Sequence, residues 1–259
     1  MIRLFFIYIS LALFAHLHAE IIEVGHFQEI TEYLDSETLV ILDIDDTLLV
    51  PIQTLGTDPW FLSRLEYHWH ITNDRSRALD KALAEWEAVR HLTDVKLVEA
   101  KTDEIIDNMQ RNNIVVMGLT TQGLSLSDRT PVQLQSLSIN LSKSAPSSQD
   151  CYFINGARGV LYHHGILFTS GTSKGEALLQ LLDLIDYHPK KIVFINDKKT
   201  HLQDVEKSAT SRNINFVGLR YSYSDERVAN FSPEIADAQW KYSSFDHLLS
   251  DEEALDFMK

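Results

Sequence analysis

Residues 40–49 read V-I-L-D-I-D-D-T-L-L, and the rest of the chain is organised around this stretch. The apolar run at residues 39–42 has the length and composition of a strand buried on both faces of a parallel sheet. Asp43 and Asp45 follow it two positions apart, so they project to the same side while strand geometry lasts. Carboxylates this close raise each other's pKa unless a cation lies between them. The stretch therefore predicts a cation site, most simply for Mg²⁺, at the end of a buried strand.

Three further apolar runs have the length of buried strands: residues 114–119, 190–195 and 214–219. Helical patterns alternate with them at residues 95–109, 176–185 and 202–209. Because alternating strands and helices are typical of α/β proteins, we predict a doubly wound parallel sheet with functional residues at the carboxyl ends of its strands.

The remaining local patterns predict smaller elements. Residues 21–34 have apolar positions at helical spacing and predict a short helix before the key strand. Asn155-Gly156 and His164-Gly165 predict hairpin turns within residues 152–168. Thr130, followed by Pro131, is the expected N-cap of another short helix. The final residues are expected to be helical at 234–240 and 251–258.

A helical insertion is expected at about residues 51–111. Pro51, Gly56 and Pro59 are turn signals that take the chain out of the sheet after the key strand. Residues 78–89 (A-L-D-K-A-L-A-E-W-E-A-V) are the clearest helix of the segment. These helices either cover the carboxyl end of the sheet as a cap or form a plain crossover, with residues 95–109 packed on the sheet.

Polar residues lie at the ends of the other predicted strands. Thr120 and Thr121 end the second strand, and Asp197 follows the third. Lys174 stands in the first turn of a predicted helix, where a cation is electrostatically unfavourable. Its position predicts a negative group in front of the helix.

In this order and spacing, Asp43, Asp45, Thr120, Lys174 and Asp197 resemble the four motifs of the haloacid dehalogenase superfamily, over residues 39–219. The D-I-D-D-T-L-L stretch is also similar to secreted acid phosphatases of that superfamily. The resemblance implies one Rossmann-like domain at residues 20–259, with a helical cap inserted after the first core strand.

The resemblance also implies chemical roles. Asp43 would be the nucleophile that forms an aspartyl-phosphate, and Asp45 the general acid and base. Mg²⁺ would be held by the Asp43 carboxylate, the Asp45 backbone carbonyl and Asp197. Thr120 and Lys174 would bind the remaining phosphoryl oxygens.

Several assignments within these motifs stay open. Either Thr120 or Thr121 can supply the phosphate-binding hydroxyl. The fourth motif departs from many relatives, since Asn196 precedes Asp197 and His201 stands where a second acid is common. Asp204 is the alternative metal ligand if the register differs, and His201 either bonds a metal-bound water or faces solvent.

The start of the insertion carries an aromatic and histidine cluster: Trp60, Phe61, Tyr67, His68, Trp69 and His70. These side chains either stack on a flat leaving group over the active face or pack the insertion together. In the first case Trp60 and Trp69 would select the substrate.

The first nineteen residues have the pattern of a secretory signal peptide. Arg3 is followed by an apolar stretch at residues 4–15, and Ala19 offers a small residue for cleavage. The alternatives are a membrane anchor or a buried first strand, but about a dozen apolar residues are short for a bilayer span. We therefore expect an exported protein, periplasmic or secreted, with no stable membrane anchor after cleavage.

Composition narrows the function further. An apolar fraction of 44% suits a globular core, and Cys151, the single cysteine, cannot form an internal disulfide. A formal net charge of -14 repels nucleic acid, so a phosphate substrate requires local positive groups. We predict a Mg²⁺-dependent phosphatase of a small-molecule phosphomonoester. A phosphotransferase, or a catalytically idle binding protein of the same fold, is the alternative.

Overall fold

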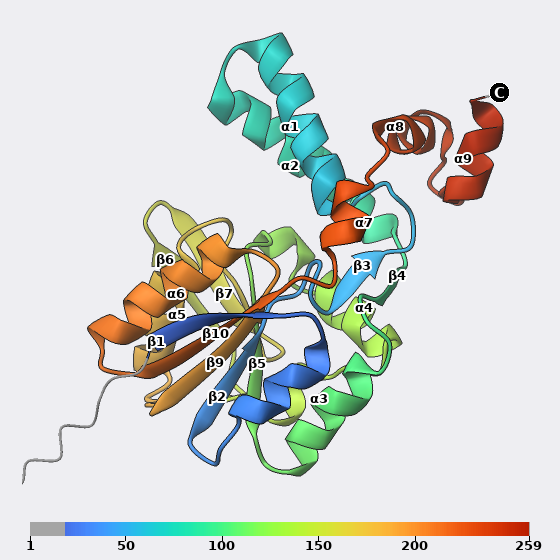
Figure 1. The fold of residues 1–259 in the computed structure, drawn as a ribbon. Coiled ribbons are helices and arrows are strands. Elements are labelled where there is room, and N and C mark those ends of the chain that lie inside the picture. The colour runs from blue at the N-terminus through green and yellow to red at the C-terminus, as the bar shows by residue number, and fades with distance from the viewer. Residues whose placement is uncertain (1–18, 259) are drawn as a thin grey trace, which may run out of the picture.

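The computed structural model describes residues 19–258, which form an eight-stranded, mostly parallel sheet flanked by helices (Figure 1). The strands in spatial order are β1 (Ala19–Val24), β10 (Asn215–Tyr221), β9 (Lys191–Asn196), β2 (Thr38–Leu42), β5 (Val115–Thr120), β8 (Ile166–Phe168), β7 (Arg158–His163) and β6 (Cys151–Asn155). The pairings from β1 to β8 are parallel, and β7 pairs antiparallel with both β8 and β6. The predicted α/β class is confirmed.

Strand β2 lies at the centre of the sheet between β9 and β5. Leu42 pairs with Ile195 of β9 and with Gly118 of β5, so the three strands end at nearly the same level. All five residues of β2 are buried. Asp43 therefore emerges between two neighbouring strand ends, as expected for a parallel sheet.

Helices cover both faces of the sheet because alternate residues of β2 point to opposite sides. Val40 and Leu42 pack with α3 (Thr102–Arg111) and α4 (Arg129–Ser136) on one face. Leu39 and Ile41 pack with α5 (Lys174–Leu184) and α6 (Lys199–Ser211) on the other. The continuous apolar run of the sequence reflects this two-sided burial.

The helix predicted at residues 21–34 is wrong in its first part. Ala19–Val24 is the edge strand β1, paired with β10, and only Phe27–Tyr33 is helical, as the 3-10 helix η1. Ile21, Ile22 and Val24 suit a strand as well as a helix, and the open edge of β10 decides between them. The predicted signal peptide lies outside the described residues, apart from Ala19 at the start of β1.

The single helix predicted at residues 95–109 is also wrong at its start. Val95–Leu97 is strand β4, which pairs antiparallel with β3 (Leu49–Pro51), and α3 begins only at Thr102. Strands β3 and β4 have three residues each, which is too short for an alternating apolar pattern to be recognised in the sequence.

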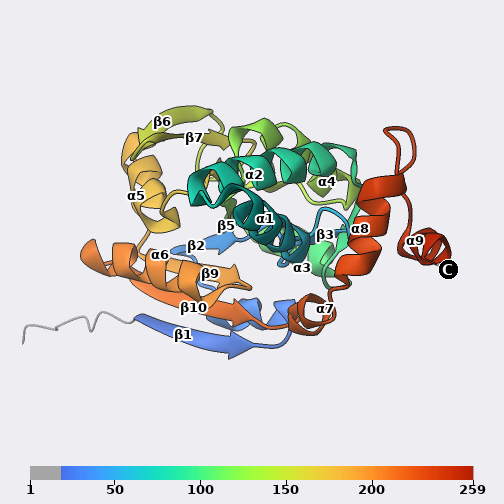
Figure 2. The same cartoon turned by 90° about the horizontal axis from the view of Figure 1, so that it is seen from above.

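Two long helices, α1 (Asp58–Thr72) and α2 (Arg75–Leu92), pair with each other and lie over the carboxyl end of the central strands, as Figure 2 shows from above. Asp74 caps α2 by accepting hydrogen bonds from the backbone N–H groups of Ser76 and Arg77. Of the two arrangements expected for the insertion, this geometry is that of a cap.

The C-terminal helices are α7 (Asp225–Ala229), α8 (Pro233–Tyr242) and α9 (Asp251–Phe257); α8 contacts α1, and α9 packs against α8 (Figure 1). Buried Gln239 donates to the Leu249 carbonyl, and its own side-chain oxygen accepts from the Leu55 backbone N–H. Asp251 accepts from the hydroxyl and N–H of Thr54. Within residues 19–258 we find no helix with the length and apolarity needed to cross a bilayer.

Candidate active site

The chain reverses direction just after β2, and this turn presents two carboxylates. The backbone N–H groups of Leu48 and Leu49 both donate to the Ile44 carbonyl, and Asp46 takes a left-handed conformation with φ of 59°. Ser224 donates to the Asp46 carbonyl, and Arg227 pairs with its carboxylate. With Asp46 held from behind, Asp43 and Asp45 both reach the cavity at the end of the sheet.

Asp43 and Lys174 form a buried ion pair. The Lys174 ammonium donates to Asp43 Oδ1 over 2.6 Å, and the two side chains are only 1% and 7% exposed. The negative group expected in front of the helix is thus Asp43 itself. A buried Lys is stable only beside such a partner, which explains why a cation is tolerated at the start of α5.

Asp204, the alternative metal ligand, holds the turn that carries Lys174. Its carboxylate accepts from the Ser173 hydroxyl at 2.8 Å and from the Gly175 N–H at 3.1 Å. Gly175 has no room for a side chain, because a Cβ would lie 2.5 Å from the Asp204 carbonyl oxygen and close to Ser208. Asp204 therefore positions α5 against α6 and points to the turn; it does not line the cavity.

Asp45 is held by two residues that the sequence analysis missed. Arg90 Nη1 donates to Asp45 Oδ1 at 2.5 Å, and Gln122 Nε2 donates to Oδ2 at 2.8 Å. Burial raises the pKa of Asp45 above its ordinary value, Arg90 acts in the opposite direction, and Asp58 adds to the rise. Two fixed donors orient this carboxyl toward the cavity.

Both missed residues have a local signal in retrospect. Arg90 continues the buried stripe of Ala78, Ala82 and Trp86 at four-residue spacing, where an arginine needs an anionic partner. Gln122 follows the threonines of β5. Thr130, predicted as an N-cap, instead lies inside α4, and its hydroxyl donates to Gln122 Oε1 at 2.6 Å.

Asp197 follows β9 and carries an unsatisfied oxygen. Its side chain is buried, and Oδ1 has no hydrogen-bond partner among the residues that the structure describes. Burial raises the pKa of Asp197 to about 8, Lys198 opposes the rise, and the charges of Asp43, Asp46 and Asp58 add to it. A buried carboxylate oxygen without a donor is costly unless a cation satisfies it.

Asp58 is a further missed residue, because it opens α1, outside the four motifs. Its carboxylate pairs with Lys198, which follows Asp197 directly. His201 also lines the cavity, and burial lowers its pKa to about 3, with Lys174 and Lys198 acting in the same direction. The imidazole of His201 is therefore neutral. Its side chain faces the cavity.

The donor set fits Mg²⁺, which prefers oxygen ligands. Within residues 19–258, no group of three or more His, Cys, Asp or Glu is arranged to hold a metal ion. The expected ligands are two carboxylates and one backbone carbonyl, which do not amount to such a group. The unsatisfied Oδ1 of Asp197 is the observation that favours a cation here.

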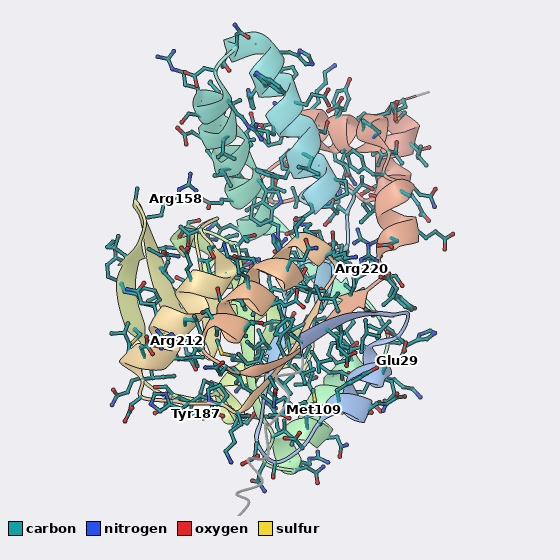
Figure 3. All side chains as sticks on the ribbon, turned by 60° about the vertical axis from the view of Figure 1, so that its left-hand side comes forward. Glu29, Met109, Arg158, Tyr187, Arg212 and Arg220 are labelled. Carbon is teal, nitrogen blue, oxygen red and sulfur yellow. The ribbon has the colours of Figure 1, made fainter. Side chains whose placement is uncertain are left out.

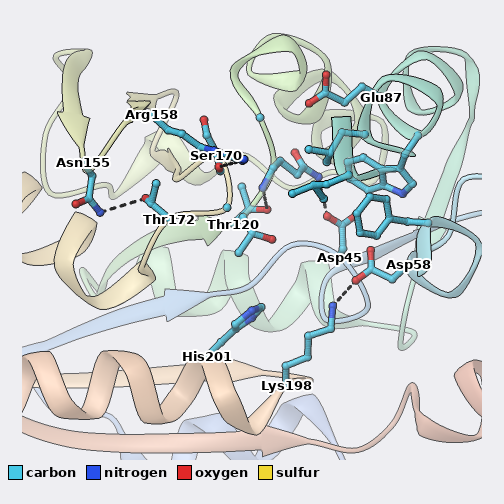
Figure 4. A pocket seen from close by; sticks show the side chains of 18 of the residues that line it. Asp45, Asp58, Glu87, Thr120, Asn155, Arg158, Ser170, Thr172, Lys198 and His201 are labelled. Carbon is cyan, nitrogen blue, oxygen red and sulfur yellow. Dashed lines mark hydrogen bonds and ion pairs between the residues drawn. The ribbon is translucent and has the colours of Figure 1, made fainter. Parts of the chain in front are cut away.

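Asp43 and Asp45 line a cavity of about 740 Å³ (Figure 4), whereas Lys174 and Asp197 are not among its lining residues. Asp45 and Asp58 lie on one side of it, and Asn155, Arg158, Ser170 and Thr172 on the other. Thr120 and Thr121 both line the floor; Thr120 is buried and Thr121 exposed. The Thr120 hydroxyl oxygen accepts from the Gln122 backbone N–H at 3.1 Å. The hydroxyl proton of Thr120 can therefore be donated to an anion.

The aromatic cluster of α1 divides into two parts. Trp60 is 1% exposed and packs with Leu55, Trp86 and Trp240, whereas Trp69 is 51% exposed. Neither is among the residues that line the cavity, so the selecting role expected for them is wrong; Phe61 and Leu62 line it instead. Helical spacing directs neighbouring residues to different faces, and the sequence did not indicate which face meets the cavity.

This division predicts a difference in stability between two tryptophan variants. Trp60→Ala removes a buried ring and should lower the free energy of unfolding by about 3–5 kcal/mol. Trp69→Ala changes an exposed side chain and should alter it by less than about 1 kcal/mol. Urea unfolding of the two variants and the wild type measures the difference, and equal losses would contradict the assignment of Trp60 to the core.

A family model described as "Protein of unknown function (DUF2608)" matches residues 23–255. The chain belongs to this family. A protein of the Chlamydia pneumoniae proteome named "Putative outer membrane protein" is 25% identical over 262 residues, covering 96% of this chain and 94% of that protein. One of the same name from Chlamydia trachomatis is 24% identical over 222 residues, covering 86% and 82%.

Among solved structures, a haloacid dehalogenase-like family hydrolase from Streptococcus pneumoniae shares 12% identity with a TM-score of 0.42. The match covers 75% of this chain and 98% of that one. Similarity at this level leaves the site to be judged on its own residues.

Proposed function

We propose that the protein is a Mg²⁺-dependent phosphatase that hydrolyses a phosphomonoester through an aspartyl-phosphate on Asp43. The observation that carries the proposal is that Asp43 and Asp45 both line the cavity while Asp43 is paired with the buried Lys174. The turn after β2 thus supplies a nucleophile and a proton donor, and the start of α5 supplies a cation for the phosphoryl group. The motif resemblance assigns the same residues the same roles.

Two steps complete the proposed reaction. Asp43 attacks phosphorus, a new carboxylate O–P bond forms, and the ester P–O bond breaks as Asp45 gives its proton to the leaving oxygen. Asp45 then takes a proton from a water that attacks the phosphorus of the intermediate, which frees inorganic phosphate and restores Asp43. Thr120 and Lys174 hold the other phosphoryl oxygens throughout.

Arg90 and Gln122 explain how Asp45 can serve both steps. Each donates to a different oxygen of the carboxyl, so both oxygens are held in place at the cavity. Thr130 in turn orients Gln122. Such support is what a general acid and base needs, because proton transfer requires hydrogen-bond reach to the reacting oxygen.

Mg²⁺ would be held by the Asp43 carboxylate, the Asp45 carbonyl and Asp197. When bound, it neutralises negative charge that develops on the transferring phosphoryl group. Asp197 is suited to this role because its buried Oδ1 has no donor within the described part of the chain.

We further propose an envelope or exported location, and one domain at residues 20–259 with α1 and α2 as a cap. The location is supported by the signal-peptide pattern of residues 1–19 and by relatives named "Putative outer membrane protein".

The test of the proposed function is the metal dependence of phosphate release. The purified protein should hydrolyse 4-nitrophenyl phosphate with Mg²⁺, lose this activity in excess chelator, and recover it when Mg²⁺ is restored. Asp197→Asn should raise the Mg²⁺ concentration for half-maximal activity about tenfold or more.

Asp204→Asn is the matched control for this measurement. It disturbs the turn before Lys174, so it should lower activity without moving the Mg²⁺ requirement. Activity that persists in chelator would overturn the metal role. A shifted Mg²⁺ requirement in Asp204→Asn alone would move the metal site to Asp204.

A further inference from the structure

Helix α2 has two apolar stripes, and only one of them packs inside the protein. Ala78, Ala82 and Val89 are buried on the first stripe. Leu79 and Leu83, one helical turn apart, are half-buried and line the cavity instead. The part of each leucine that faces the cavity gains nothing from the fold, since this apolar surface stays accessible to solvent.

Helix α1 extends this apolar wall. Phe61 and Leu62 line the cavity from the neighbouring helix, and Leu62 is 59% exposed. Trp86 of α2 contributes as well. The cap thus presents five large apolar side chains to the same space, directly above the floor formed by Asp43 and Thr120.

The facing wall is polar. It consists of the β6–β7 turn and the loop that precedes α5, with Asn155, Arg158, Ser170 and Thr172 on the cavity (Figure 4). Arg158 lies at the end of the sheet that faces α1 and α2 (Figure 3). Its guanidinium donates to the Ser170 carbonyl at 2.9 Å. A leaving group in this cavity meets five apolar side chains on the cap side, together with the carboxylates of Asp58 and Glu87, and hydrogen-bonding groups on the other side.

The cavity is much larger than a phosphate ion. A volume of about 740 Å³ falls in the range of sites that hold drug-sized ligands. The phosphoryl group occupies the floor, so most of the volume belongs to the leaving group.

We propose that the cavity selects phosphomonoesters with an aromatic leaving group, whose ring covers Leu79 and Leu83 of α2. The assignment rests on the proposed function and names the substrate class of the same site. A flat ring buries the leucines on its face and keeps polar substituents at its edge for Asn155 and Arg158. A polyol leaving group would place hydroxyls against Leu79 and Leu83, whose side chains offer no hydrogen-bond partner.

The test compares 1-naphthyl phosphate with glycerol 3-phosphate, whose leaving group is small and polar. For the double variant Leu79→Ala/Leu83→Ala we expect kcat/KM for 1-naphthyl phosphate to fall tenfold or more, about 1.4 kcal/mol. For glycerol 3-phosphate it should stay within about threefold, because that substrate does not reach α2. Leu92→Ala, an exposed leucine of the same helix that does not line the cavity, is the matched control and should change neither value.

A second variant guards against a folding defect in the first. Leu62→Ala changes an exposed side chain of α1 and should lower kcat/KM for 1-naphthyl phosphate in the same selective way, by about threefold. Equal losses on both substrates, or no preference for 1-naphthyl phosphate in the wild type, would overturn the substrate class.

Binding separates this inference from the proposed function. If neither ester is hydrolysed, the proposed function fails, and fluorescence titration with 1-naphthyl phosphate decides the rest. Affinity that falls tenfold in Leu79→Ala/Leu83→Ala would still support the aromatic subsite, whereas equal affinity, or no binding to the wild type, would overturn it.

Discussion

Replacing Asp43 with asparagine is expected to lower kcat for any phosphomonoester by roughly 10³-fold or more. The amide keeps the size of the carboxyl but lacks the charge and the nucleophilic oxygen pair that attack phosphorus. Release of phosphate from 4-nitrophenyl phosphate, with a thermal unfolding scan beside it, measures the effect. No aspartyl-phosphate should be trapped in this variant.

The fold should survive this change despite the loss of a buried ion pair. Lys174 loses the charge of its direct partner, but the amide oxygen of the new side chain can still accept its hydrogen bond. Removing one of several crowded acids also relieves their mutual repulsion. A buried ammonium without a carboxylate is costly, so the melting temperature should fall while the variant stays folded at the assay temperature.

Asp46→Asn is the matched control for Asp43→Asn. Its carboxylate pairs with Arg227 of α7 and does not line the cavity, so activity should stay within about tenfold of the wild type. The nucleophile assignment is wrong if Asp43→Asn keeps activity in that same range.

Replacing Asp45 with asparagine is expected to lower steady-state turnover by roughly 10²- to 10⁴-fold. The amide cannot give a proton to the leaving oxygen or take one from water. The loss in the first step should be smaller for 4-nitrophenyl phosphate than for an alkyl phosphate, because nitrophenolate leaves without protonation. Rapid-quench measurements on both esters resolve the two steps.

The same variant should reveal the covalent intermediate. With 4-nitrophenyl phosphate, Asp43 still attacks phosphorus and nitrophenolate leaves, but hydrolysis of the aspartyl-phosphate lacks a base. A burst of nitrophenol close to one equivalent should therefore precede slow turnover. Equal losses on both esters, without a burst, would remove Asp45 from the acid and base roles and leave it a structural partner of Arg90.

Much of the site was predictable from position along the chain. Asp43, Thr120 and Asp197 each stand at or just after the end of a predicted strand, and β2, β5 and β9 do lie side by side in parallel. Parallel strands bring their carboxyl ends to one edge, so order in the sequence implies proximity in space. Lys174 was predictable too, since a buried cation at a helix start requires an anion in front of it.

The hydrogen-bond partners of Asp45 and the edge strand of the sheet could be identified only in the tertiary structure. Arg90 lies 45 residues from Asp45, Gln122 lies 77 residues away, and Asp58 is 140 residues from Lys198. Local periodicity shows that a side chain is buried but does not name what it is buried against.

By itself, the sequence determined the buried central strand, the α/β alternation and the two carboxylates that follow β2, because burial on both faces and strand-end position leave direct marks on residue order. Only the tertiary structure decided that residues 19–24 form the edge strand β1, that Trp60 packs in the core while Leu79 and Leu83 face the cavity, and that Asp204 serves the turn before α5. Each of these outcomes depends on which surface a distant segment of the chain leaves open. The free energy of such long-range packing cannot be inferred from a local stretch of residues.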